Sequence, residues 1–329
     1  MLTLPPFEYH APTSLAEALA LLTQHAGQVK LIAGGTDLVP NMKHRLFTPR
    51  HVVGLKGIAD LDYIREEGKG IRIGAMTTIA ALARSERVQA RLPSLAQAAA
   101  QIAGPQLREM GTLGGNLCLD TRCVYYNQTY FWRQALGFCL KKDGTVCHVV
   151  KAGKKCVAAA SNDSAPVLMS LGASVRIAGP RGEREMPLQD FYLPDGIVNT
   201  ALAADEIVVE ARIPAPPPGL KMGYQKVRVR AAIDYPALTV AVAYQVDAGQ
   251  KLGDLRLVVS ALGARPHPVA RLDAFRGRPL GATLKRELGA AVHKQCHPLT
   301  NINVDPSWRR EILPVIVRRA LDEAQEARA

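Results

Sequence analysis

Apolar residues recur along the chain at two spacings, the helical one and that of short apolar strands. Together these patterns predict a mixed α and β protein. Apolar residues at helical spacing begin at Ser14, which stands three positions before Glu17 in the arrangement of a capping box. Helices are predicted over 14–25, 38–45, 77–84, 92–102, 163–171 and 306–326. Strands are predicted over 29–33, 51–55, 71–75, 174–177, 185–187, 223–230, 237–246 and 255–262.

A proline-rich segment at 213–219 marks the expected domain boundary, because successive prolines stiffen the backbone and remove donors from a sheet ladder. Beyond it, the pattern predicts a small sheet with helices packed against it. We therefore expect domains at 1–216 and 220–329.

Composition and charge narrow the class of protein. The chain has 329 residues, of which 48% are hydrophobic and 21% are charged, as in an ordinary globular protein. It has no signal-like N-terminus and no apolar run of the ~18 residues that a membrane span needs, so we expect a cytoplasmic protein without membrane contact. The net charge of +12 suits nucleic acid, acidic proteins or anionic substrates, but no nucleic-acid recognition motif accompanies the basic residues.

Two glycine loops are candidate anion sites. The first, Lys30-Leu31-Ile32-Ala33-Gly34-Gly35-Thr36-Asp37, lies between a predicted strand and a predicted helix, where backbone N–H groups can converge on a pyrophosphate. The second is Gly111-Thr112-Leu113-Gly114-Gly115-Asn116. The first loop is neither a Walker motif nor a complete Gly-x-Gly-x-x-Gly fingerprint, so an ordinary tight turn is an equal alternative there. The second loop is a weak signal by its spacing alone, because the alternative is that Thr112 or Asn116 satisfies local backbone groups.

Five of the six cysteines follow the second loop, at positions 118, 123, 139, 147 and 156. Thiols of a cytoplasmic protein stay reduced, so this cluster indicates a metal site more than disulfides. The irregular spacing favours an iron–sulfur cluster over zinc, and unligated thiols remain an alternative. His148 is a less favoured ligand, and Cys296 is expected to be structural. The nearby aromatic residues either shield a cluster from water or form the core of a long insertion. The nearby basic residues either offset the negative charge of a cluster or form a solvated face.

These motifs, taken together, resemble the FAD-binding medium subunits of the molybdenum hydroxylases, the xanthine dehydrogenase and carbon monoxide dehydrogenase group. The resemblance rests on the two glycine loops, on Ile102-Ala103-Gly104, on Asp163-Ser164-Ala165-Pro166, and on Lys226 ahead of Asp234. It implies an α+β fold: a two-part FAD-binding domain of the PCMH/vanillyl-alcohol-oxidase type, divided near residue 57, and a small α+β C-terminal domain.

The stretch at about 118–160 resembles an insertion found in the β subunits of 4-hydroxybenzoyl-CoA reductases, which carry an additional [4Fe–4S] cluster. That resemblance makes Cys123, Cys139, Cys147 and Cys156 the cluster ligands and leaves Cys118 without this role.

The resemblance also assigns FAD contacts. Residues 30–37 would hold the pyrophosphate, and 111–116 would add a second backbone surface. Ile102 would lie by the adenine, where relatives often have an aromatic residue. Asp163 would bond the polar chain of the cofactor, Val208 would line the site, and Lys226 would lie near the isoalloxazine.

The implied function is electron transfer without substrate chemistry on this chain. The implied partners are a large molybdopterin subunit and a small subunit with two [2Fe–2S] clusters, in a dimer of heterotrimers, with ferredoxin as the external carrier. The expected reaction is reductive dehydroxylation of 4-hydroxybenzoyl-CoA. The alternative is the same role in an oxidative hydroxylase or dehydrogenase for another aromatic, heterocyclic or aldehyde substrate.

Overall fold

The first part of the chain forms a small parallel sheet. The computed structural model describes residues 2–326. In it β1 (Glu8–His10), β2 (Val29–Ile32) and β3 (His51–Gly54) pair in the order β1-β3-β2. α1 (Leu15–Gln24) joins β1 to β2, and the Glu17 backbone N–H donates to Ser14 Oγ, so the predicted cap is confirmed. α2 (Leu38–Lys43) follows the first glycine loop, which confirms the predicted order of strand, glycine turn and helix.

A second, antiparallel sheet has five strands in the order β4-β5-β8-β6-β7. Their bounds are β4 Ile64–Glu67, β5 Gly70–Gly74, β6 Ser174–Gly179, β7 Gly182–Pro187 and β8 Ile207–Ile213. The predicted hairpin is confirmed as β6 and β7. The residues between β5 and β6 contain the second glycine loop, five of the six cysteines and most of the helices. The sheet is therefore assembled from strands that are far apart in the chain.

The central strand β8 is absent from the sequence prediction, because Glu210 interrupts its apolar run just before the prolines. The Glu210 side chain is fully buried, yet its carboxylate accepts from Arg72 Nε at 2.9 Å and from Arg212 Nε at 2.7 Å. A buried charge is tolerated where it is paired in this way. Ion pairs with the neighbouring strand β5 and within β8 itself thus allow an acidic residue in the middle of the sheet.

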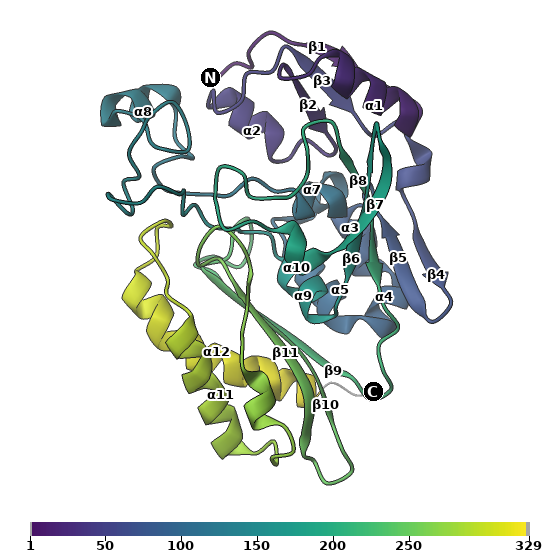
Figure 1. The fold of residues 1–329 in the computed structure, drawn as a ribbon, viewed down its shortest axis with the longest axis vertical. Helices are drawn as coiled ribbons and strands as arrows, with labels where there is room; N and C mark the ends of the chain where they lie inside the picture. The colour runs from purple at the N-terminus through teal and green to yellow at the C-terminus, as the bar shows by residue number, and fades with distance from the viewer. Residues whose placement is uncertain (1, 327–329) are drawn as a thin grey trace.

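A layer of helices lies between the five-stranded sheet and the C-terminal sheet (Figure 1). α5 and α9 contact each other and also β9 and β10 of the C-terminal sheet, so one apolar core extends across both parts. The helices of this region are α3 Ile79–Arg84, α4 Glu86–Arg91, α5 Pro93–Ala100, α6 Pro105–Met110, α7 Leu113–Leu117, α9 Ser164–Ser170 and α10 Leu188–Phe191, whereas η1 (Ala59–Leu61) joins β3 to β4 and packs in the N-terminal core.

The C-terminal sheet is antiparallel, in the order β12-β11-β10-β9. Its elements are β9 Lys221–Val227, β10 Leu238–Val246, β11 Leu252–Ser260, β12 His267–Pro268, η2 Leu272–Phe275, α11 Ala282–Gln295 and α12 Pro306–Glu326. Alternate residues of β10 serve two cores: Val240 and Val242 face α11 and α12, whereas Ala241 and Ala243 face the helix layer. This double burial explains the nearly continuous apolar run at 237–246. The prediction missed α11.

The cysteine-rich insertion forms a lobe at one side of the molecule (Figure 1). Its regular element is α8 (Tyr130–Leu136), and loops make up most of the rest. A bridge between Arg122 and Ala159 closes its base, and the Val124 N–H donates to Asn301 O of the C-terminal part. Among the described residues, no helix has the length and apolar character required to span a bilayer.

Candidate flavin and iron–sulfur sites

A cavity of ≈ 630 Å³ lies between the two glycine loops, β8 and the loop that joins β9 to β10. Residues predicted to bind the cofactor form much of its lining, with two exceptions: Leu113 is fully buried in the core, and Lys226 lies outside the lining. The predicted residues that line the cavity are Lys30, Leu31, Ile32, Ala33, Gly34, Gly35, Thr36, Asp37, Ile102, Gly111, Thr112, Gly114, Gly115, Asn116, Asp163 and Val208.

The first glycine loop offers backbone donors to this cavity. Within residues 2–326, the N–H groups of Gly34, Gly35 and Thr36 donate to no protein acceptor. Gly34 also lies against the second loop, since a Cβ built there would be 1.7 Å from Met110 O. Only glycine permits this approach. The loop therefore presents a set of unpaired N–H groups suited to a pyrophosphate.

Most of the N–H donors of the second glycine loop are already paired with protein acceptors. Leu113 N donates to Thr77 O, Gly114 N donates to Ala75 O, and Gly115 N donates to Thr112 Oγ1. Gly114 is held tightly, because a Cβ there would lie 2.7 Å from Ala75 Cβ. This loop lines the cavity as a rigid surface, and the anion-binding donors lie mainly on the first loop.

Asp163 is the N-cap residue of α9 and is buried at the cavity wall. Its Oδ1 accepts from Tyr224 Oη at 2.6 Å, and its Oδ2 accepts from Lys226 Nζ at 2.9 Å. Burial raises the pKa of Asp163 and lowers the pKa of Lys226, while their mutual attraction opposes both shifts. Lys226 also donates to Gln101 O at 3.0 Å, so it holds Asp163 from behind instead of facing the cavity.

A polar cluster at the edge of the cavity connects the first glycine loop to the insertion. Arg122 Nη1 donates to Asp37 Oδ1 at 3.1 Å, and the Arg122 guanidinium lies 4.0 Å from the ring centroid of Tyr235. Asn41 Nδ2 donates to the other Asp37 oxygen at 3.0 Å. Burial is the largest effect on the Asp37 carboxyl and raises its pKa to about 6 despite the attraction of Arg122.

The four predicted cluster ligands, Cys123, Cys139, Cys147 and Cys156, line one small cavity in the insertion, with His148 and Tyr126 beside them. Backbone N–H groups point at two of the sulfurs: Val150 N lies 3.5 Å from Cys147 Sγ, and Ala158 N lies 3.4 Å from Cys156 Sγ. Cys118 lines the larger cavity and not this one. The insertion thus brings together thiols that are far apart in sequence.

The arrangement of the thiols bears on which metal they suit. Tetrahedral zinc with Zn–S of about 2.3 Å needs sulfurs about 3.8 Å apart. Among the described residues, no three of these sulfurs lie within 4.8 Å of one another. Burial raises the pKa of the Cys123 thiol to about 11, so deprotonation there requires a bound metal. Four thiols around a cavity fit a polynuclear cluster better than a single ion.

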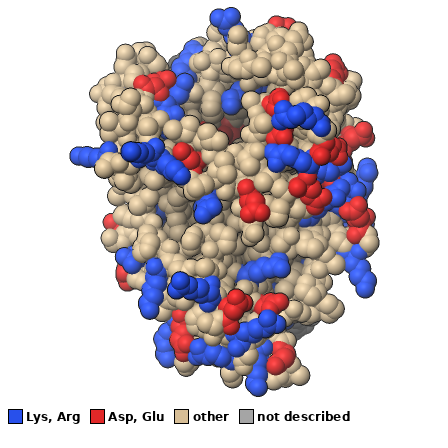
Figure 2. Space-filling view, in the orientation of Figure 1, with Lys and Arg blue, Asp and Glu red and all other residues tan. Residues whose placement is uncertain are grey.

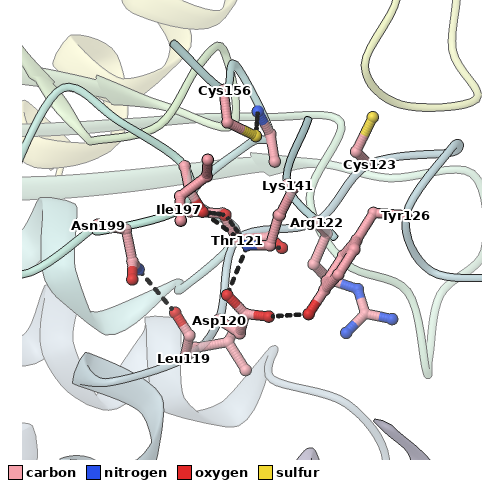
Figure 3. A network of polar contacts seen from close by, with 12 residues as sticks. Leu119, Asp120, Thr121, Arg122, Cys123, Tyr126, Lys141, Cys156, Ile197 and Asn199 are labelled. Carbon is pink, nitrogen blue, oxygen red and sulfur yellow. Dashed lines mark hydrogen bonds and ion pairs between the residues drawn. The ribbon is translucent and has the colours of Figure 1, made fainter. Parts of the chain in front are cut away.

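Lys141 anchors this cavity to the body of the protein (Figure 3). Its nearly buried ammonium donates to Asp120 Oδ1 at 2.6 Å and to Gly196 O at 2.7 Å. Asp120 also accepts from Tyr126 Oη at 2.8 Å. The interpretation of the basic residues here as a solvated face is wrong for Lys141 and for Arg133, whose side chain is 1% exposed and donates to Arg45 O.

Comparison with known proteins identifies the family. Residues 5–216 match the model of the FAD binding domain in molybdopterin dehydrogenase, and residues 223–324 match that of the CO dehydrogenase flavoprotein C-terminal domain. The chain belongs to the FAD-binding medium subunits of the molybdenum hydroxylase family.

Individual relatives of this medium subunit cover between 82% and 99% of its length. The carbon monoxide dehydrogenase medium chain of Hydrogenophaga pseudoflava is 32% identical over 325 residues, with 97% of each chain covered. The aldehyde oxidoreductase FAD-binding subunit PaoB of Escherichia coli is 35% identical over 278 residues, covering 82% of this chain and 85% of that one. A solved carbon monoxide dehydrogenase from H. pseudoflava superposes with a TM-score of 0.83 at 30% identity, covering 99% of this chain and 100% of that one.

Three functional contacts of this medium subunit were not anticipated from its sequence. They are Tyr224 on Asp163, Arg122 on Asp37, and Tyr235 against Arg122. Each joins residues more than sixty positions apart, so no local spacing signals them. The available clue in the sequence was that the insertion begins at Cys118, just after the second glycine loop.

Proposed function

We propose that this medium subunit is an electron-transfer subunit with two redox groups, an FAD between the glycine loops and a [4Fe–4S] cluster in the insertion. By analogy with its relatives, it works beside a large molybdenum subunit and a small subunit with [2Fe–2S] clusters, arranged as a dimer of heterotrimers. The observation that carries the proposal is that Cys123, Cys139, Cys147 and Cys156 line one cavity next to the flavin cavity.

The residues of the larger cavity fit FAD. The N–H groups of Gly34, Gly35 and Thr36 would hold the pyrophosphate, and the surface from Gly111 to Asn116 would limit its position. Asp163 keeps lone pairs for the hydroxyls of the cofactor, because Tyr224 and Lys226 occupy one site on each oxygen. Bound FAD supplies the ability to exchange both one and two electrons.

The residues of the insertion fit a [4Fe–4S] cluster. Four cysteine thiolates are the usual ligands, and N–H groups directed at sulfur stabilise the negative charge of such a cluster. Val150 N and Ala158 N supply that contact here. Exposed Lys151, Lys154 and Lys155 precede Cys156, and their charge suits docking of an acidic carrier of the ferredoxin type.

The reaction of the assembled enzyme has two candidates. The named relatives, carbon monoxide dehydrogenase and aldehyde oxidoreductase, favour an oxidative hydroxylase or dehydrogenase for an aromatic, heterocyclic or aldehyde substrate. The cysteine insertion favours reductive dehydroxylation of 4-hydroxybenzoyl-CoA, in which a low-potential carrier delivers electrons to this subunit. The choice is made by the molybdenum subunit, and assays of the complete complex with both substrate classes distinguish them.

The proposal is tested on protein purified without oxygen, by its visible spectrum and by iron and sulfide analysis. We expect flavin bands and about four irons per chain. Cys139→Ser should remove the cluster and keep FAD, and the matched change Cys118→Ser should keep both. Protein that carries zinc in place of iron, or Cys118→Ser protein that loses its cluster, would contradict the proposal.

A further inference from the structure

Three histidines from separate elements meet at the surface of the N-terminal sheet. His10 ends β1, His25 follows the last residue of α1, and His51 begins β3. One ring nitrogen of each lies within 4.8 Å of the others, and this is the one such group of histidine, cysteine or acidic side chains within residues 2–326. No part of the flavin or cysteine site uses it.

Two of the three histidines are as close as neighbouring ligands of one metal ion. His10 Nε2 lies 3.1 Å from His51 Nδ1. The Glu8 carboxylate lies beside two of the histidines, with Oε2 at 3.5 Å from His51 Nδ1 and Oε1 at 3.9 Å from His10 Nε2. Zinc with Zn–N of about 2.0–2.1 Å places its neighbouring ligand atoms about 3.3 Å apart. The ligand atoms of His10, His51 and Glu8 are thus separated by distances close to those around one zinc ion.

We propose that His10, His25, His51 and Glu8 bind one divalent transition-metal ion of the zinc class. Three imidazoles and one carboxylate form a ligand set that suits zinc and its neighbours in the transition series, whereas calcium and magnesium prefer oxygen alone. The His25 and His51 rings stack with centroids 3.7 Å apart. Ligation by both requires the His25 ring to turn out of this stack, which its position beyond the end of α1 permits.

The ion would act as a staple for the N-terminal sheet. β1 and β3 have three and four residues, and the register places Glu8 opposite His51. Val29, the first residue of β2, also lies opposite His51, and β2 ends at the first glycine loop. A metal at one end of this small sheet would therefore stabilise the strand that carries the flavin loop at its other end.

The test is a titration of the full chain, with its iron–sulfur cluster intact, by Co²⁺ and then by Zn²⁺. We expect one equivalent of Co²⁺ with visible ligand-field bands but no thiolate charge-transfer band, its displacement by Zn²⁺, and a rise in the melting temperature. The double variant His25→Asn/His51→Gln should lose that equivalent and the rise. The matched control His293→Asn alters a histidine that faces a single carboxylate, Glu311, at 3.4 Å, and should keep both.

A second variant keeps the proposal testable if the double variant does not fold. Glu8 has a side chain that is 66% exposed, so Glu8→Gln should fold normally and weaken Co²⁺ binding by roughly 10–100-fold. The proposal is overturned if the wild-type chain takes up no such equivalent, if the bound Co²⁺ shows thiolate charge transfer, or if these changes leave its affinity unaltered.

Discussion

Arg122 Nη1 donates to Asp37 Oδ1 across 3.1 Å, and this contact joins the cysteine insertion to the first glycine loop. Arg122 precedes Cys123, one of the proposed cluster ligands, and Asp37 is the N-cap residue of α2. The two proposed redox sites therefore share one ion pair. On the face shown in Figure 2, the basic and acidic side chains of the described residues are interspersed and form no single broad charged patch. We therefore look to specific ion pairs of this kind for the electrostatic contribution to the sites.

Removing Arg122 should weaken retention of FAD. Arg122→Gln leaves the Asp37 carboxylate without its cation and releases Tyr235, so the cavity edge loses its shape. We expect roughly tenfold weaker FAD binding, which corresponds to about 1.4 kcal/mol. Flavin fluorescence during reconstitution measures it. The control Arg276→Gln breaks an exposed pair with Asp254, outside the cavity lining, and should change the affinity little; equal effects of both changes would contradict a specific role for Arg122.

The titration of Asp37 should make the flavin-free protein more stable on mild acidification. Its pKa is raised from 3.8 to about 6 in the folded protein, so the folded state holds a proton that the unfolded state has released. The contribution of Asp37 to stability therefore falls as the pH rises from about 4 to about 6 and is constant above. The Asp37→Asn variant should lack this slope, so the difference in melting temperature between the wild type and the variant should change between about pH 4 and about pH 6.

The control for that experiment is Asp234→Asn. The hydrogen bond from Arg230 lowers the pKa of Asp234, so this carboxylate stabilises the fold above its unfolded pKa and loses the effect in acid. The two variants should therefore differ from the wild type with opposite dependence on pH. A melting difference for Asp37→Asn that does not vary between about pH 4 and pH 6 would contradict the assignment.

Asp163 and Lys226 should behave as a coupled buried pair. Lys226→Met leaves a buried carboxylate with Tyr224 as its donor, and Asp163→Asn leaves a buried ammonium with Gln101 O. Each single change should lower the free energy of unfolding by about 3 kcal/mol, and the double variant should lose less than the sum. Urea denaturation provides the values. Tyr224→Phe, which removes one hydrogen bond, should cost about 1 kcal/mol; strictly additive single changes would argue against the pair.

Gly34→Ala should separate the two glycine loops. The added Cβ would stand 1.7 Å from Met110 O, so the first loop must move away from the second. We expect a loss of about 1–3 kcal/mol in stability together with loss of bound flavin. Gly263→Ala is the matched control, because its Cβ would meet nothing within 4 Å. Flavin content and the melting temperature after purification provide the readout, and a Gly34→Ala protein that retains both at the wild-type level would refute the argument.

Local patterns in the sequence determine much of the fold. Ser14 caps α1 as its spacing with Glu17 predicts, and the strand and helix around residues 33–37 occur where periodicity places them. These features depend on interactions within a few residues, which sequence spacing encodes directly. The prediction failed for β8 and α11, where Glu210 is paired across strands and where apolar residues are sparse. Their stability comes from distant partners, which no local pattern records.

The same distinction between local patterns and contacts of distant segments applies to the candidate site. By itself the sequence determined the identities of the glycine loops and the cysteines, since backbone flexibility and thiolate chemistry belong to single residue types. Only the tertiary structure decided which atoms face which cavity: Leu113 is buried in the core, Lys226 lies behind Asp163, and Arg122 reaches Asp37. It also brought His10, His25 and His51 together. Such contacts depend on how distant segments pack, because a side chain acts on its neighbours in space whatever their separation in the chain.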